Sequence, residues 1–308
     1  MDQLDKALFQ ELSNHCRVSF TDLSVKYDVS VNTIKNRIEE LVKKGIIVSF
    51  DVQLKLSLYN ASFALVVLRL KRLFTEQEQD EIGNHRFVTS VSTGIQLDGQ
   101  VIVIYRNNEE LNEVIEYLRG NENVKELDLY QMLPPPTSTV SLPVSRKLDS
   151  LKTIDWQILH KLRWNGRMPI KDLAQEIGRS VPTVRKRLDY MREQGFLYET
   201  ILTNIGVVDP GFVINFGMEF PEVSSENQIE IDKELGSIFQ DSFIVSWKVV
   251  DRPIIFMTFQ VDSAKEAQKI QARLLSKFPE HLSITQAISG KWKYYRDFRD
   301  QMLEERSR

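Results

Sequence analysis

The chain has 308 residues, of which 42% are hydrophobic and 27% charged, and its net charge is −3. This length is enough for two to four domains with real cores. The single cysteine, Cys16, excludes an intrachain disulfide framework, and no apolar run reaches the roughly 18 residues needed to cross a bilayer. The first residues are acidic and unlike a secretory signal, so we expect a cytoplasmic protein with no membrane partner.

The first fifty residues predict helix, helix, short turn, helix and strand in that order. Apolar residues recur at helical spacing over about residues 3–15 and again from Ser30 onward. The hydroxyl of Ser30 suits a helix N-cap, and Gly45 suits the position just after a helix. The β-branched stretch Ile46–Val52 is typical of a strand or wing. This order indicates a winged helix-turn-helix.

The same order recurs at an offset of 150 residues without a gap. Ser30 matches Ser180 and Gly45 matches Gly195, while core positions keep their apolar character. Residues 148–200 contain ten Lys and Arg against seven Asp and Glu, whereas residues 1–50 contain seven of each. We therefore expect the second copy to attract phosphates more strongly than the first.

Each copy is followed by a segment whose pattern predicts β-α-β-β-α-β, the split βαβ arrangement of ferredoxin-like domains. The predicted fold class is therefore α+β, with two winged helix-turn-helix domains alternating with two ferredoxin-like domains. A Pro-rich stretch between the halves favours an extended spacer. The predicted bounds are 1–52 and 148–200 for the winged helices, 53–133 and 201–290 for the ferredoxin-like domains, 134–147 for the linker and 291–308 for a C-terminal helix.

The helices that begin at Ser30 and Ser180 carry the candidate DNA-binding residues. At about 100° per residue, polar and basic side chains lie away from the apolar stripe of each helix. Asn can pair with adenine, and Arg or Lys with guanine, in the major groove. The candidates are Asn32, Thr33, Lys35, Asn36, Arg37, Arg179, Pro182, Thr183, Arg185, Lys186 and Arg187.

Two of these candidates, Arg37 and Arg187, have an alternative interpretation. They occupy identical positions in the two copies, about 60° from the centre of the apolar stripe. Either they hold the scaffold through an ion pair or they clamp a phosphate, and the repeat alone cannot decide between these roles. The aromatic residues of the tail also have two readings, packing of a last helix on a domain or contacts to DNA or to a second chain.

The sequence predicts no metal, no cofactor and no catalytic residue. The four histidines show no ligand spacing with Cys16 or with each other, and no glycine loop of the phosphate-binding kind occurs. We expect Cys16 to be a small, partly buried residue rather than a nucleophile.

These motifs resemble the DNA-binding domain of the leucine-responsive/asparagine-synthetase (Lrp/AsnC) regulators, and the ferredoxin-like units look like that family's ligand-sensing and assembly domain. The resemblance covers nearly the whole chain, twice, so the chain looks like a tandem form. It is carried in the first copy by Leu4-Asp5, Leu12, Arg17, Leu23, Ser30, Arg37, Leu41 and Gly45-Ile46-Ile47, and in the second by Ile154-Asp155, Leu162, Arg167, Leu173-Ala174, Ser180, Arg187 and Gly195.

The resemblance implies a sequence-specific transcription regulator that binds double-stranded DNA and responds to a small molecule such as an amino acid. Its effector would lie near a glycine-aspartate turn, which here contains Thr93, Gly94 and Asp98. The matching turn of the second half contains Lys248 and Asp251, and the lysine stands where the family has glycine. The second half therefore departs from the pattern on which effector binding rests in the family.

Two other functions stay open on the same fold. Siroheme decarboxylases resemble this fold, and the resemblance implies a His-Arg pair after the wing, but Asp51–Lys55 and Thr203–Val207 contain no histidine. A sensor or assembly protein without DNA binding is the other alternative. The ferredoxin-like sheets could pair within a chain or between chains, and from the family we expect a homodimer with four DNA-binding units.

Overall fold

The computed structural model describes residues 1–94, 98–133, 148–208, 211–222, 233–239 and 242–308. The predicted linker at 134–147 lies outside the described residues. The chain divides into two compact units. One contains both helix-turn-helix copies and the C-terminal helix, and the other contains both ferredoxin-like sheets. The predicted α+β class is confirmed.

The first helix-turn-helix copy has the predicted order. It consists of α1 (Gln3–Asn14), α2 (Phe20–Tyr27), α3 (Val31–Lys43) and β1 (Ile47–Leu54). Asp2 starts α1 with a capping box, because its side chain accepts from the Asp5 backbone N–H and the Asp5 carboxylate accepts in return. The core is the predicted apolar stripe, with buried Leu8, Leu12, Leu23, Ile34, Ile38 and Leu41.

The second copy repeats this architecture. It consists of α6 (Thr153–Leu162), α7 (Ile170–Glu176), α8 (Val181–Glu193) and β6 (Leu197–Thr203), preceded by the short 3-10 helix Leu148–Ser150. Its buried residues stand 150 positions after those of the first copy: Ile158, Leu162, Leu173, Val184, Leu188 and Met191. The internal repeat therefore identified the core of both copies.

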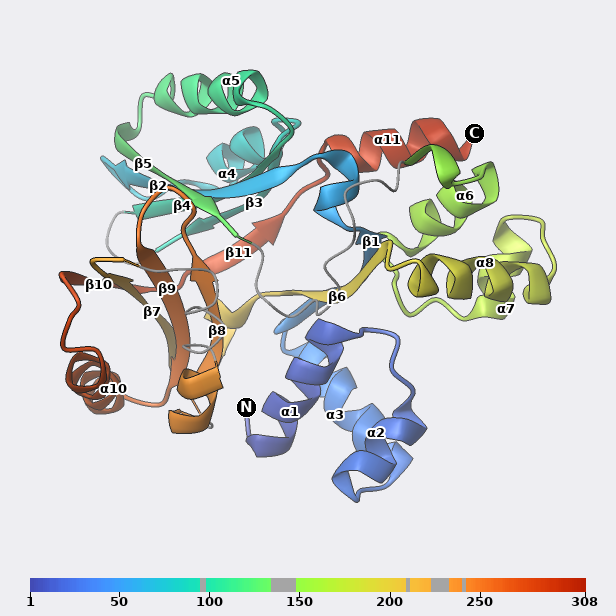
Figure 1. Ribbon diagram of the computed structural model, residues 1–308, viewed down its shortest axis with the longest axis horizontal. Helices are drawn as coiled ribbons and strands as arrows, with labels where there is room; N and C mark the ends of the chain where they lie inside the picture. Colours follow the sequence, from blue (N-terminus) through green and yellow to red (C-terminus); the bar gives the residue numbers. More distant parts are fainter. Residues whose placement is uncertain (95–97, 134–147, 209–210, 223–232, 240–241) are drawn as a thin grey trace. The chain divides into compact units, whose positions relative to one another are not determined.

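The strands predicted as wings pair with each other rather than within their own copies. β1 and β6 form an antiparallel two-stranded sheet (Figure 1). From Ser49 to Val52 the register maps onto itself under the 150-residue offset: Phe50 pairs with Ile201, and Asp51 pairs with Thr200. Such a self-complementary pairing is what a two-fold dimer interface has. One chain thus builds a pseudo-dimer of helix-turn-helix domains.

Two matched arginines reinforce this pairing. Arg17 of the first copy donates to the carbonyls of Gly166 and Met168, the second at 3.0 Å. Arg167 of the second copy donates in return to the carbonyls of Cys16 and Val18, at 2.7 and 3.1 Å. Each guanidinium satisfies two backbone acceptors in the other copy, so the pseudo-two-fold relation extends to side chains.

The ferredoxin-like unit has two antiparallel sheets. The first is built from β2 (Ser62–Leu70), β3 (Val88–Thr93), β4 (Asp98–Tyr105) and β5 (Val124–Met132), with α4 (Glu76–Gly83) and α5 (Asn108–Arg119) in the crossovers. The 3-10 helix Leu56–Tyr59 precedes it. The strand order β3-β4-β2-β5 is that of the predicted split βαβ fold.

The second sheet has the same topology. It contains β7 (Phe212–Glu219), β8 (Phe243–Lys248), β9 (Ile254–Val261) and β10 (Ser283–Ile288) in the order β10-β7-β9-β8, after the 3-10 helix Ile205–Val207. Residues 233–238 are helical in the first crossover, and α10 (Ala264–Lys277) is the other crossover. Aromatic side chains dominate the core, which includes Phe216, Phe239 and Phe259.

The two sheets pair within the chain. An isolated antiparallel bridge joins Met132, at the end of β5, to Val249, just after β8. Phe63 of β2 meets Trp247 edge to face, with ring centroids 5.6 Å apart, and Tyr130 meets Phe256 in the same way at 5.1 Å. The pairing that the sequence left open is therefore intramolecular in this structure.

The predicted helix over 291–308 is wrong at its start. Lys291–Tyr294 forms β11, which adds to the first sheet beside β3, and the helix α11 begins only at Phe298 and runs to Ser307. Alternating Lys and aromatic residues suit a strand with one exposed and one packed face. α11 then packs along α6 (Figure 1) and buries Phe298 and Leu303. Packing is thus the role that the structure gives these two apolar residues of the tail.

No helix among the described residues is long and apolar enough to cross a membrane.

Candidate nucleic-acid interface

In each copy the third helix, α3 or α8, begins at a serine N-cap. The Ser30 Oγ accepts from the Thr33 backbone N–H at 3.0 Å, and the Ser180 Oγ accepts from the Thr183 N–H at 3.3 Å. In each case the threonine hydroxyl also meets the serine hydroxyl. Such caps stabilise a helix by about 1 kcal/mol. The predicted residues Thr33, which is half-buried, and Thr183, which is exposed, are thus both part of the caps.

The tight turn before each of these helices contains a residue whose backbone is in the left-handed region, with positive φ. Asp28 fills this position in the first copy with φ +51°, and Gly178 fills the same position in the second with φ +63°. Aspartate tolerates this region better than most residues with a Cβ, and glycine adopts it without strain. The two copies therefore keep the same turn with different residues, which leaves the following helices in equivalent positions.

The exposed face of α3 is mixed in charge. Asn32, Lys35 and Asn36 are exposed, as predicted. However, the Lys35 ammonium lies 3.7 Å from the Glu39 carboxylate, and Lys43 lies 3.6 Å from Glu40. The lysines of this helix are thus partly neutralised by their own neighbours.

The exposed face of α8 is basic. Arg179, Pro182, Arg185 and Lys186 are all exposed. Asp189, which follows Arg185 by one helical turn, lies 3.3 Å from Arg192 instead. Within the part of the chain that the structure describes, no carboxylate forms an ion pair with Arg179, Arg185 or Lys186. Their charges are therefore available to phosphates or base edges.

The structure favours the scaffold interpretation of Arg187. It binds the buried carboxylate of Asp155 in a bidentate ion pair, with Nε 2.7 Å from Oδ1. Its guanidinium also stacks over Tyr190, 4.5 Å from the ring centroid. Arg37 makes a looser version of the pair, 2.6 Å from Asp2 and 3.4 Å from Asp5. Arg37 thus links α3 to α1, and Arg187 links α8 to α6.

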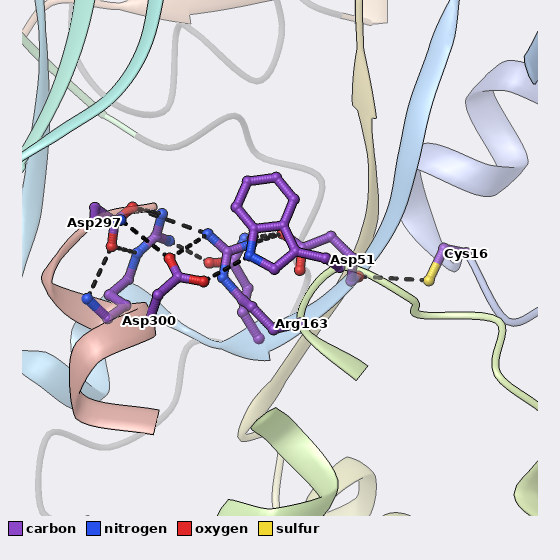
Figure 2. Close-up of polar contacts among 8 residues, drawn as sticks. Cys16, Asp51, Arg163, Asp297 and Asp300 are labelled. Carbon is purple, nitrogen blue, oxygen red and sulfur yellow. Dashed lines mark hydrogen bonds and ion pairs between the residues drawn. The ribbon is translucent and has the colours of Figure 1, made fainter. Parts of the chain in front are cut away.

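Sequence reasoning missed a buried charge cluster beside the paired strands. Arg163, at the end of α6, lies 2.5 Å from Asp51 of β1 and 3.5 Å from Asp300 of α11 (Figure 2). Asp297 lies next to Asp300 in the same cluster and pairs with Arg299 at 2.6 Å. Burial raises the pKa of Asp51 to about 6, although Arg163 opposes this rise. The cluster joins the first copy, the second copy and the C-terminal helix.

This cluster could not be found by motif, because its members come from stretches that are more than 100 residues apart. Trp164 adds a hydrogen bond of 2.6 Å to Asp300, and the Cys16 thiol lies 3.5 Å from the Asp51 carbonyl oxygen. Cys16 is fully buried, and burial raises the pKa of its thiol to about 12. The thiol is therefore held in its protonated, unreactive form.

The candidate effector residues fall in two turns of the ferredoxin-like unit. The Gly94 N–H donates to the Asp98 carbonyl at 2.9 Å, and a Cβ at Gly94 would come within 2.2 Å of the Asp98 carboxylate. Thr93 ends β3 and faces Lys291 of β11 in the ladder. The intervening residues 95–97 lie outside the described residues. Gly94 and Asp98 are therefore joined by a backbone hydrogen bond, and Thr93 is flanked by the added strand.

The corresponding residues of the second half are arranged differently. Lys248 is buried at the end of β8, and its carbonyl accepts from the Leu133 N–H at 2.8 Å. Asp251 is exposed and lies 3.8 Å from Arg252. These residues stand where the two sheets join, so the two turns are not equivalent.

Comparison with known proteins gives a consistent result for the helix-turn-helix copies. A family model described as winged helix-turn-helix DNA-binding matches residues 1–48 and 151–198. An uncharacterized HTH-type transcriptional regulator of Pyrococcus abyssi is 26% identical over 137 residues, which is 43% of this chain and 92% of that protein. Each copy thus has a match of its own.

Among solved structures, a siroheme decarboxylase, NirDL, aligns over 99% of this chain and 98% of its own, with a TM-score of 0.58 and 13% identity. AsnC of E. coli aligns over 46% of this chain and 97% of its own, with a TM-score of 0.32 and 18% identity. The first of these likenesses shows that the whole domain order occurs in another single chain. At this identity it concerns the fold alone.

Proposed function

We infer that the protein is a transcription regulator that binds specific sequences of double-stranded DNA. The chain resembles Lrp/AsnC regulators in tandem form and carries the winged helix-turn-helix DNA-binding domain twice. The observation that supports this most is the pairing of the two copies. One chain presents two capped helices, α3 and α8, in a unit with an internal two-fold relation. Dimeric helix-turn-helix proteins use such a relation to bind two half-sites.

The exposed residues of these helices suit this role. The first copy offers amide groups at Asn32 and Asn36, and the second offers the cations Arg185 and Lys186. Arg179 lies just before the Ser180 cap, where it can reach a phosphate. The net charge of the whole chain is negative, so we expect this local surface rather than the overall charge to determine DNA affinity.

The experiment is selection of genomic fragments by the purified full chain, followed by titration of an enriched fragment at two salt concentrations. We expect enrichment of specific sequences and an affinity that falls as salt rises. The double variant Arg185→Ala/Lys186→Ala is the control, and it should retain the fold and lose most of the affinity. A chain that enriches no sequence and binds no duplex at low salt would refute the proposal.

The enzymatic alternative rests on fold likeness alone. The chain aligns with a siroheme decarboxylase over nearly its whole length, yet identity is 13% and the stretches after both paired strands contain no histidine. We propose no catalytic activity. Incubation of the purified chain with siroheme tests this directly, and decarboxylation of siroheme would overturn it.

We also propose that a small molecule such as an amino acid modulates binding through the turn from Thr93 to Asp98. The support is the backbone hydrogen bond from Gly94 to Asp98 and the position of Thr93 beside β11. Repeating the selection with and without an amino-acid pool tests this. An unchanged set of fragments and an unchanged melting temperature in every pool would count against an effector of this class.

A further inference from the structure

We propose that the two helix-turn-helix copies recognise different base pairs, so that the operator is an imperfect inverted repeat. The first copy takes an A·T-preferring half-site through Asn32 and Asn36, and the second takes a half-site containing G·C pairs through Arg185 and Lys186. This inference rests on the proposed function and specifies the DNA that this site binds.

The first step is that the scaffolds are equivalent while the exposed faces are not. The caps Ser30 and Ser180 make the same contacts, the helices have 13 residues each, and the buried positions match one to one. Equivalent scaffolds place equivalent positions at equivalent depths in the groove. Differences at those positions are therefore differences in base contacts and not in docking.

The second step concerns the first copy. Asn32 and Asn36 are exposed and four residues apart, so they lie on the same side of α3. An asparagine amide can donate to N6 and accept at N7 of adenine in a matched pair of bonds. Lys35, between them in sequence, is held by Glu39, and the exposed carboxylates of Glu39 and Glu40 disfavour close phosphate contact. Amide chemistry therefore dominates this face.

The third step concerns the second copy. Pro182 replaces Asn32 and removes hydrogen-bonding capacity at that position, whereas Lys186 replaces Asn36 and Arg185 replaces Lys35. Both cations lack an ion-pair partner among the residues that the structure describes, since the nearest downstream acid, Asp189, is turned to Arg192. Arginine and lysine donate to O6 and N7 of guanine. This face therefore selects guanine where the first selects adenine.

The fourth step is the relation between the half-sites. Because the β1–β6 register maps onto itself, the two helices are related by a pseudo-two-fold axis. A two-fold relation gives inverted half-sites, and unequal faces give unequal half-sites. We expect roughly 5- to 150-fold discrimination against a duplex in which the selective base pair of one half-site is exchanged.

The experiment is selection from a pool of random duplexes with three full-length chains. The first is the wild type. The second, Lys35→Arg/Asn36→Lys, gives the first copy the cations of the second, and the third, Arg185→Lys/Lys186→Asn, gives the second copy the residues of the first. All exchanged residues are exposed, and thermal unfolding of each variant checks that the fold is kept.

We expect the wild type to select one A·T-rich and one guanine-containing half-site in inverted orientation. The second chain should select guanine in both half-sites, and the third should select guanine in neither. Equal half-sites from the wild type, or unchanged preferences in both exchange variants, would overturn the inference while DNA binding stands. Absence of binding to any duplex would instead refute the proposed function itself.

Discussion

Single side chains of the exposed faces should contribute unequally to DNA affinity. Lys186 has no ion pair with any residue that the structure describes, and Asn36 is its neutral counterpart beside Glu39 and Glu40. We predict that Lys186→Ala weakens binding more than Asn36→Ala does, by about 1 kcal/mol or more at moderate salt, because it removes a charge-assisted contact. Fluorescence anisotropy at one fixed salt concentration measures both.

Lys265→Ala, on the exposed face of α10, is a matched control for the loss of one charge, and it should leave affinity nearly unchanged. An equal or larger loss from Asn36→Ala than from Lys186→Ala would contradict the predicted inequality between the copies.

Arg37 and Arg187, which occupy the same position in α3 and α8, should affect stability rather than DNA affinity. Arg187→Ala leaves the buried carboxylate of Asp155 without its ion-pair partner, which should cost about 3 kcal/mol of unfolding free energy. Arg37→Ala should cost no more than about 1 kcal/mol, because Arg37 and its partner Asp2 are largely exposed. Chemical denaturation gives both values. A weakened DNA affinity with unchanged stability in Arg187→Ala would favour the phosphate clamp instead.

At the scale of elements, the carboxylate of Glu199 links the paired strands to both copies. It lies 2.8 Å from Arg192 of the second copy and 2.8 Å from the His15 ring of the first. Burial raises its pKa, but hydrogen bonds from His15 and Arg192 outweigh burial and lower the pKa to about 2. A lowered carboxyl pKa gives stability that is complete above the unfolded pKa and disappears as the pH falls through the folded one.

We therefore predict that Glu199→Gln lowers the unfolding free energy by about 3 kcal/mol at pH 7 and that the difference from the wild type closes between pH 4.5 and about 2. Urea denaturation at a series of pH values measures this difference. Glu280→Gln, at an exposed position, is the control and should show little difference at any pH. A difference that stays constant with pH would show that the loss comes from packing and not from the charge.

Elements were predictable from the sequence wherever the interactions that define them are local. The caps at Ser30 and Ser180, the glycines after both helices and the apolar stripes are all short-range features, and the repeat supplied a second copy of each. The strand Lys291–Tyr294 was missed because four alternating residues are too few to tell a strand from a helix before the partner strand β3 is known.

The pairings were not predictable for a related reason. β1 and β6 each have the composition of a strand, but nothing in either stretch says whether its partner is in the same copy or in the other. The cluster of Asp51, Arg163 and Asp300 joins residues from three distant segments, and each alone looks like an ordinary charged residue. Of the candidate site, the exposed faces could be predicted, whereas their arrangement in a pseudo-dimer could not.

At the scale of the whole molecule, the family led to the expectation of a homodimer, and this stays a prediction. The structure gives a second chain a different role in DNA binding from the one expected of a dimer. The intrachain pairing already supplies two helices with a two-fold relation, so a second chain is not needed to occupy two half-sites. It would instead bring the number of DNA-binding copies to four. Light scattering at micromolar concentration distinguishes the monomer from the dimer.

The fixed pairing predicts a strict dependence on half-site spacing. The paired strands, the reciprocal arginines and the buried cluster hold α3 and α8 in one unit, so they cannot follow half-sites that are moved apart. Inserting five base pairs turns one half-site by about half a helical turn, since B-DNA repeats every 10 to 10.5 base pairs. We predict that this insertion reduces affinity to that of a single half-site, as measured by anisotropy on otherwise identical duplexes.

The double variant Arg17→Ala/Arg167→Ala, which removes the reciprocal contacts, should bind the original spacing less tightly and lose less on insertion. Equal affinity of the wild type for both spacings would mean that the two copies bind DNA independently, and the pseudo-dimer would then not be the DNA-binding unit.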